Sequence, residues 1–340
     1  MSPLTPSQPK PTPNRQPQAR PGFSLIELMV VIVIIGILLA LLLPAINNVT
    51  TGTQTAQIKV EIEKMAQGVA EFKTQYGQEP PSGIILSEAG GAWDTQSTIA
   101  IQTMWPQFDF TIDRDLDDDG TAGEADPDGD GNPGMKLTGD ECLVFFLGGV
   151  DTLGPTADAV ADGFSSNPSD PFSSGGNRVA AFVEFDPDRF VDTDGDGANS
   201  YTDIYEDTTV PYLYLSSYNG RRYRVLNDAD IDNNGVPELY LSIDSDGNGT
   251  EDEQGYAVYM QKDPNSLIPN SSTSTPEDGE VAWNKNGFQI ICAGADGEFG
   301  CGGIWSDDDG ISFNFGSGEE VLNVRAAADN ITNFSSGTLE

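Results

Sequence analysis

The stretch GFSLIELMVVIVIIGILLALLLPAI, residues 22–46, decides the architecture of the N-terminal part of the chain. Apart from Gly36, every residue from Leu28 to Leu43 is apolar, and no charged residue occurs between Leu28 and Ile58. Because a helix rises about 1.5 Å per residue, this run suits a membrane-spanning helix of about 20 residues. It is too long and begins too late for the core of an ordinary signal peptide.

One carboxylate, Glu27, lies in the first turn of this apolar run. A charged side chain at such a position is costly, and this favours a functional role. The preceding segment contains Lys10, Arg15 and Arg20 among many prolines, so we expect it to be disordered and to lie on the cytoplasmic side. The remainder of the chain is then outside the cytoplasm.

The residues GFSLIEL, from Gly22 to Leu28, resemble the cleavage and methylation signal of type IV pilins and type II secretion pseudopilins. The resemblance implies that a prepilin peptidase cuts after Gly22 and methylates Phe23, and that Glu27 directs docking of the subunit onto a growing fibre. It also implies other partners: copies of the chain, other pilin-like subunits, an inner-membrane assembly platform, and membrane lipid before assembly. The expected location is the bacterial inner membrane, crossed once with the acidic domain in the periplasm, and then a pseudopilus or a surface fibre.

The helix is predicted to continue beyond the membrane and to stop near Gly77, because Pro80 and Pro81 follow. An apolar stripe at spacings of three and four residues marks its buried face. The stripe comprises Ile58, Ile62, Met65, Val69 and Phe72. The residues from Phe72 to Pro81 resemble the end of the long helix in the major pseudopilin. We therefore divide the chain into a leader (1–22), a membrane and assembly half-helix (23–47), a soluble half-helix (48–80) and an acidic exported domain (81–340).

The composition is strongly acidic, with 16 Lys and Arg against 54 Asp and Glu and a formal net charge of −38. Such a surface repels phosphate backbones, which argues against nucleic acid as a partner, and favours divalent cations. The absence of histidine removes Ser-His-Asp and Cys-His catalysis and His-ligated zinc. We expect no enzyme, since a carboxylate-dependent glycosidase would rest on the number of acids alone.

Two aspartate-rich stretches match the spacing of a calcium loop, which needs oxygen ligands at alternate positions and a glycine at the sixth. They resemble EF-hand-like loops of the dockerin type. The first stretch places Asp115, Asp117, Asp119 and Asp126 as ligands. The second places Asp192, Asp194, Asp196, Ser200 and Asp203. Incomplete runs begin at Asp126, Asp230 and Asp244, and for these an unoccupied acidic turn is an equal alternative.

The C-terminal region from Phe288 to Gly300 is similar to the strand and calcium loop of the major pseudopilin. The resemblance implies Ca²⁺ ligands at Asp296 and at a second stretch, either 307–311 or 329–334. We prefer the latter, with Asp329, because its residue order is closer to that of the family. Of the three cysteines, Cys292 and Cys301 could form a disulfide that closes a short loop, which leaves Cys142 unpaired.

The order of elements predicts an α+β, pilin-like fold: a long N-terminal hydrophobic helix packed on an antiparallel sheet, with long Asp-rich calcium loops. A short buried helix ended by glycine is expected at 139–149, and strands at 212–217, 223–226, 239–243, 256–260 and 288–292. The predicted function is a structural, calcium-stabilised subunit of a type II secretion pseudopilus or a type IV pilus-like fibre. The alternative is a membrane-anchored, calcium-dependent surface binding module that is exported with a pilin-type signal.

Overall fold

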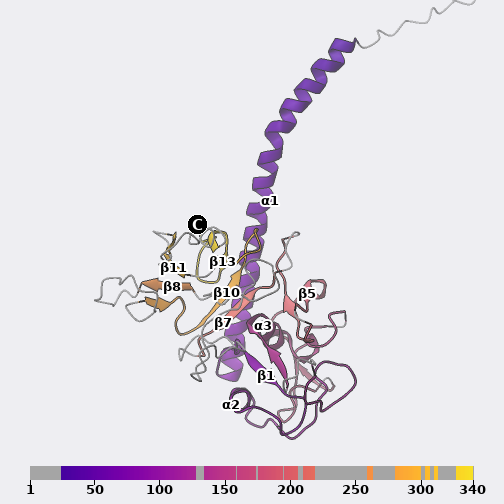
Figure 1. Ribbon diagram of the computed structural model, residues 1–340, viewed down its shortest axis with the longest axis vertical. Helices are drawn as coiled ribbons and strands as arrows, with labels where there is room; N and C mark the ends of the chain where they lie inside the picture. Colours follow the sequence, from indigo (N-terminus) through magenta and orange to yellow (C-terminus); the bar gives the residue numbers. More distant parts are fainter. Residues whose placement is uncertain are drawn as a thin grey trace, which may run out of the picture. The chain divides into compact units, whose positions relative to one another are not determined.

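The chain divides into two compact units, residues 1–50 and residues 51–340, and each is described by itself. Figure 1 shows the computed structural model of the protein. It describes residues 24–127, 134–157, 159–173, 175–193, 195–205, 210–218, 259–262, 280–299, 303–306, 310–312 and 327–339.

The first unit contains the beginning of helix α1, which runs from Leu25 to Tyr76 over 52 residues. Its side chains from Ser24 to Leu42 are all exposed. By length and composition, the segment Leu25–Leu42 is apolar enough to cross a membrane. The predicted apolar helix is therefore confirmed.

The second unit buries the remainder of α1 along the predicted apolar stripe, which is the face that the spacing of three and four residues places on one side. All five stripe residues are at most 1% exposed, and they are Ile58, Ile62, Met65, Val69 and Phe72. The helix ends as predicted, because Gly77 adopts a left-handed φ of +80° and donates its amide to the carbonyl of Lys73 at 2.8 Å.

A three-stranded antiparallel sheet, in the order β13–β10–β7, packs on this stripe. Its strands are β7 (Leu213–Ser216), β10 (Phe288–Cys292) and β13 (Ile331–Thr332). Alternate residues face two different cores, since Tyr214 and Ile290 join the core around α1. Leu215 and Ile291 join a smaller core on the other face, with Trp305. The predicted helix packed on an antiparallel sheet is confirmed.

Two polar side chains of α1, Glu61 and Lys59, bind the middle of the helix to this sheet and to its neighbours. The Arg189 guanidinium forms two hydrogen bonds with the Glu61 carboxylate, at 2.6 and 2.9 Å, and the Tyr212 hydroxyl donates to the same carboxylate at 2.6 Å. The Lys59 ammonium donates to the carbonyls of Thr332 at 2.6 Å and Ser335 at 2.5 Å. Residues far apart in the sequence are therefore joined through α1.

The short helix predicted around Cys142 is α3, which runs from Gly139 to Gly148. A capping box begins it, because the Thr138 amide donates to the Glu141 carboxylate at 2.6 Å. Cys142 is fully buried, as are the two phenylalanines that follow it. The helix ends at Gly149, whose φ of +113° suits glycine.

The region between α1 and β7 contains elements that the sequence did not predict. Among them are β1 (Ile84–Leu86), α2 (Thr95–Met104) and β2 (Met135–Leu137), and β1 pairs with β2 in an antiparallel ribbon. The others here are η1 (Val150–Thr152), β3 (Phe164–Ser165), β4 (Arg178–Val179), η2 (Pro187–Arg189), β5 (Phe190–Val191) and β6 (Ser200–Tyr201). They are short strands and turns, so no long periodic pattern marks them in the sequence.

A second sheet has the order β12–β11–β8–β9. Its strands are β8 (Tyr259–Lys262), β9 (Glu280–Ala282), β11 (Gly303–Ser306) and β12 (Gly310–Ser312). One pair, β8 with β11, is parallel, which the expectation of an antiparallel sheet did not include. The parallel pair is possible because a long connection that contains β9 and β10 separates the two strands.

The predicted strands have different outcomes. Strand β10 matches the prediction for 288–292, and β7 lies within 212–217. Strand β8 begins at Tyr259, near the end of the predicted 256–260. The strands predicted at 223–226 and 239–243 lie outside the described residues.

Candidate assembly segment and metal centre

The exposed apolar segment begins with a reciprocal hydrogen-bonded cap. The amide of Ser24 donates to the Glu27 carboxylate at 2.8 Å, and the amide of Glu27 donates to the Ser24 hydroxyl oxygen at 3.2 Å. This is the capping-box arrangement, in which two otherwise unpaired amides of the first turn are satisfied. Glu27 therefore caps the first turn of the helix, in addition to any role in assembly. The spacing of three residues between Ser24 and Glu27 is the sequence signal for this cap.

Beyond this cap, the segment is apolar on all sides. Leu25 is 77% exposed and Leu41 is 72% exposed, and the large apolar residues between them are also exposed. A helix that is apolar all round is stable only within a membrane or when covered by other helices. The segment therefore has the chemistry of a membrane span and of a helix-packing surface.

A cluster of three carboxylates lies in the second unit, between the end of β1 and the first predicted calcium loop. One oxygen each from Glu88, Asp115 and Asp117 lies within 4.8 Å of the others. Glu88 follows β1 in the chain, and its carbonyl accepts from the Arg114 amide at 2.9 Å, which holds the loop against the strand end. Two of the four predicted ligands of this loop are thus brought together, with a third carboxylate that the loop pattern does not contain.

Backbone amides position these carboxylates. One oxygen of Glu88 accepts from the amide of Leu116 and, at 3.2 Å, from that of Asp117. Asp115 accepts from the amide of Gly120 at 3.0 Å, and Gly120 has the left-handed φ of +89° that the sixth position of such a loop requires. Asp119, a predicted ligand, is not in the cluster; it accepts from the Thr121 amide at 2.7 Å.

Two carboxyl groups of the cluster, Glu88 and Asp117, have raised pKa values because they are partly removed from water and lie near other acids. Burial raises the pKa of Glu88 above its usual range, and the charges of Asp117 and Asp115 add to this effect, which two backbone amides oppose. The pKa of Asp117 is raised mainly by burial, with the charges of Asp119 and Asp115 contributing. Ionisation of Glu88 and of Asp117 is therefore less favourable in the folded protein than in water.

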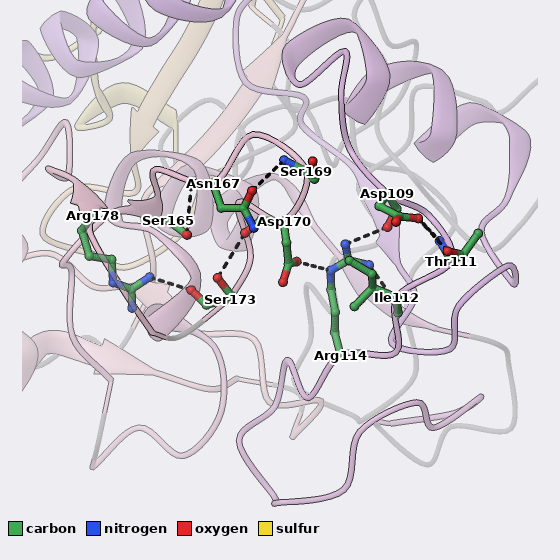
Figure 2. A network of polar contacts seen from close by, with 10 residues as sticks. All are labelled: Asp109, Thr111, Ile112, Arg114, Ser165, Asn167, Ser169, Asp170, Ser173 and Arg178. Carbon is green, nitrogen blue, oxygen red and sulfur yellow. Dashed lines mark hydrogen bonds and ion pairs between the residues drawn. The ribbon is translucent and has the colours of Figure 1, made fainter.

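The arginine next to this cluster points elsewhere (Figure 2). Arg114 donates from Nε to Asp170 at 2.9 Å, and from Nη2 to the carbonyl of Asp109 at 2.9 Å. Its guanidinium also lies over the Phe108 ring, 4.2 Å from the centroid. Arg114 is consequently committed to a separate network that ties residues 109–114 to 165–173.

The second predicted calcium loop is partly described. Asp192 accepts from the amides of Gly195 at 2.7 Å and Gly197 at 3.2 Å, and Asp196 accepts from the amide of Ala198 at 2.7 Å. Asp194 lies outside the described residues. In this turn the aspartate carboxylates accept hydrogen bonds from backbone amides of the same loop.

The last two predicted ligands of this loop have other partners. The Ser200 hydroxyl donates to Asp140 at 2.7 Å, at the beginning of α3. Asp203 is buried; it accepts from the Tyr205 amide at 2.8 Å and from the Cys292 thiol at 3.4 Å. Both side chains are used where β6 joins the domain, so their role as ligands stays a prediction.

The two aspartate loops touch. A methyl group placed on Gly197 would lie 3.7 Å from the β-carbon of Asp117, and Gly154 fits closely against the carbonyl of Asp117. The Gly154 amide donates to the Gly197 carbonyl at 2.7 Å, which joins the two segments. A side chain at Gly154 would collide with the Asp117 carbonyl and separate the loops, whereas at Gly197 the left-handed φ of +87°, and not lack of space, favours glycine.

The predicted C-terminal loop brings its two aspartates together. Asp329 accepts from the amides of Ala295 at 2.7 Å and Asp296 at 3.2 Å. Burial, with the charge of Asp296 beside it, raises the pKa of Asp329 to about 6. Cys292, at the end of β10, is a free and buried thiol, and its predicted disulfide partner Cys301 lies outside the described residues. The pairing therefore stays a prediction.

Comparison with known proteins finds a short family motif in the N-terminal segment. Residues 18–43 match the family described as the prokaryotic N-terminal methylation motif. The N-terminal segment is similar to that of type IV pilin-family proteins. The pilin-type segment includes the capped start of α1 and its exposed apolar run, and it also includes Gly22 and Phe23, which lie outside the described residues.

Curated relatives support the same assignment over a limited length. The chain is 41% identical over 59 residues to the fimbrial protein of Neisseria meningitidis serogroup B, which is 17% of this chain and 35% of that protein. It is 36% identical over 84 residues to the type IV major pilin protein PilE1 of Neisseria gonorrhoeae, which is 23% of this chain and 39% of that protein. The chain thus spans between a third and two fifths of the relatives it matches. No solved structure matches it.

Glu88 is the candidate ligand that sequence reasoning missed. It stands alone after a short strand, 27 residues before Asp115, and no pattern of spacing links the two. Only the pairing of β1 with β2 and the return of the loop bring them together. Asp126, the predicted last ligand of the loop, is not in the cluster, and neither is Asp119.

Proposed function

We propose that this protein is a structural subunit of a type IV pilus-like fibre or a type II secretion pseudopilus, with no catalytic role. It is held in the bacterial inner membrane by the pilin-type segment before assembly, with the acidic domain in the periplasm. Prepilin peptidase cleaves it after Gly22 and methylates Phe23. Its partners are copies of itself, other pilin-like subunits and the inner-membrane assembly platform.

The observation that carries this proposal is the exposed apolar start of α1. This segment lies within the methylation motif and has one carboxylate in its first turn. An apolar helix continuous with a buried stripe suits a subunit that leaves the membrane by packing its helix against those of other subunits. In the isolated chain Glu27 is satisfied by Ser24. In the fibre, the new α-amino group of a neighbouring subunit would compete for this carboxylate.

We also propose that the loops at 192–203 and 296–329 bind Ca²⁺. Both hold carboxylates in tight turns closed by backbone amides, and oxygen ligands of this kind suit Ca²⁺. A bound ion would stabilise the folded domain by mass action. On this view the exported domain reaches its full rigidity only where calcium is plentiful.

The mass of the N-terminal peptide, taken from protein extracted from its native membrane, tests the proposal. We expect a peptide that begins at Phe23 and carries one added methyl group. A peptide that retains residues 1–22 would contradict the proposal and leave the calcium-dependent surface binding module as the better function.

A pair of variants separates assembly from capping. Glu27→Gln is expected to reduce the yield of fibres in an assembly assay, because the carboxylate charge is lost. Ser24→Ala removes the hydroxyl that caps the helix but keeps that charge, so fibre yield should stay near that of the unmodified protein. Equal losses in the two variants would mean that Glu27 acts only by starting the helix.

A further inference from the structure

The strongest unassigned site in the molecule is the cluster of Glu88, Asp115 and Asp117. Its members come from two segments: Glu88 lies two residues after the end of β1, and Asp115 and Asp117 belong to the aspartate loop. One oxygen of each residue lies within 4.8 Å of the others. Glu88 is 0% exposed, so this carboxylate is removed from solvent. Carboxylates are rarely buried together unless a cation accompanies them.

The cluster leaves carboxylate oxygens unused. Within the described ranges, Oε2 of Glu88 and Oδ1 of Asp115 are buried and have no hydrogen-bond partner. The other oxygen of each residue is held by the backbone, Glu88 by the amides of Leu116 and Asp117, and Asp115 by the amide of Gly120. Each side chain is therefore fixed by one oxygen and offers the other to a ligand.

No basic side chain that the structure describes is paired with these oxygens. Arg114, which precedes Asp115 in the chain, forms its ion pair with Asp170. Arg178, the other arginine of the neighbouring network, forms its ion pairs with Asp151 and Asp162. The cation that the cluster requires must then come from solution.

We propose that Glu88, Asp115 and Asp117 bind one divalent cation, with Glu88 as a buried ligand supplied from outside the aspartate loop. The donors are all carboxylate oxygens, which suit hard ions and disfavour zinc or copper. Calcium fits best, because it accepts oxygen ligands at about 2.3–2.6 Å in flexible geometry and completes its shell with carbonyls and water. Magnesium usually keeps several waters and binds through one or two carboxylates, so a group of three carboxylates favours calcium.

This site differs from the loop that spacing predicts. Asp119 and Asp126 are not in it, and Glu88 takes the place of a closing carboxylate at the end of the loop. An ion bound here would add a link between the residues after β1 and the loop, which hydrogen bonds of Glu88 with the amides of Arg114, Leu116 and Asp117 already join. The proposal does not depend on the fibre function.

The test counts bound calcium on the full chain in detergent micelles, after EDTA treatment and removal of the chelator. Equilibrium dialysis with radioactive calcium gives ions per chain for the unmodified protein, for Glu88→Gln and for Glu79→Gln. Glu79 is the matched control, because it is also a buried glutamate, 5% exposed, but is paired with Lys73 at 2.9 Å.

We expect Glu88→Gln to bind one calcium ion fewer per chain, and Glu79→Gln to keep the full number. In EDTA, the thermal midpoint of Glu88→Gln should be no lower than that of the unmodified protein, because the amide keeps the acceptor and removes a buried charge. An unchanged ion count in Glu88→Gln would overturn the site, as would an equal loss in both variants.

If Glu88→Gln does not fold, a second variant tests the site. Asp117→Asn is then measured in the same way, since its side chain is only partly buried. Loss of one ion supports the site, and an unchanged count overturns it. Peptide processing at Gly22 is read separately, so failure of the metal site and failure of the proposed function are distinguishable.

Discussion

Glu61 and Arg189, 128 residues apart in the sequence, form a two-pronged ion pair that fastens helix α1 to the η2–β5 segment. The Arg189 guanidinium also lies over the Tyr201 ring, 4.3 Å from its centroid, and donates to the carbonyl of Thr202 at 3.0 Å. Both side chains of the pair are mostly buried, at 17% and 25% exposure. Removal of one partner leaves the other charge partly desolvated.

Arg189→Ala should therefore lower the free energy of unfolding by about 2–4 kcal/mol, measured by urea denaturation of the full chain in micelles. Tyr212→Phe removes only the hydroxyl that donates to Glu61 and should cost about 1 kcal/mol. A cost for Arg189→Ala as small as that for Tyr212→Phe would mean that the pair contributes little to stability.

Gly197→Ala should destabilise the domain by about 1–2 kcal/mol, because a left-handed φ of +87° is unfavourable for a residue with a β-carbon. The added methyl meets Asp117 and Met135 at ordinary contact distance, 3.7 Å, so backbone strain is the main cause. Gly175→Ala is the control, because no atom lies within 4 Å of its methyl and its φ is not left-handed. Its stability should be unchanged or slightly raised, and equal effects in the two variants would contradict the expectation.

Asp162 should make stability depend on pH. Burial and the charge of Asp151 raise its pKa above the usual range, although Arg178 opposes this shift. The folded protein therefore holds the Asp162 proton more tightly than the unfolded chain does, and this contribution, present below the usual pKa, is lost as the pH rises through the raised pKa.

Asp162→Asn cannot titrate, so its stability relative to the unmodified protein should increase between about pH 3 and pH 7. The change should be below about 1 kcal/mol, because the side chain is 39% exposed. Urea denaturation across this range measures it. A difference that stays flat or decreases with pH would show that the carboxylate is not destabilised by folding.

The thiols of Cys142 and Cys292 should resist alkylation in the folded protein. Both are at most 1% exposed, and burial raises the pKa of each well above the ordinary range, so little thiolate forms. Mass spectrometry after iodoacetamide treatment should find both unmodified before denaturation and both modified after it, without a reductant. Modification of Cys292 only after reduction would instead establish the disulfide with Cys301.

Local patterns predicted the parts of the fold that they control directly. The stripe from Ile58 to Phe72, the stop at Gly77 and the strand 288–292 each follow from spacing or from a single turn residue. The contacts that decide the candidate sites are of another kind. Glu88 meets Asp115, and Glu61 meets Arg189, only because the chain returns across the domain, and no periodicity in the sequence records such a return.

The same reason explains why spacing alone did not group Glu88 with the aspartate loop. Spacing predicted a loop from Asp115 to Asp126, and in the described residues Asp115 and Asp117 lie with Glu88, while Asp126 is outside this group. The ligand assignments stay predictions. The Arg114 amide donates to the Glu88 carbonyl at 2.9 Å, and this contact holds the residues after β1 beside the loop.

Lys59 has a consequence for the order in which the protein folds. Its ammonium is held by carbonyls of Thr332 and Ser335, and β13 beside them pairs with the central strand β10. Helix α1 is synthesised long before residues 327–339, so its apolar stripe lacks part of its packing until those residues are available to fold. Contacts of such high sequence separation make folding slow. A chain whose synthesis stops early would expose this stripe, and is therefore expected to be a target for chaperones and proteases.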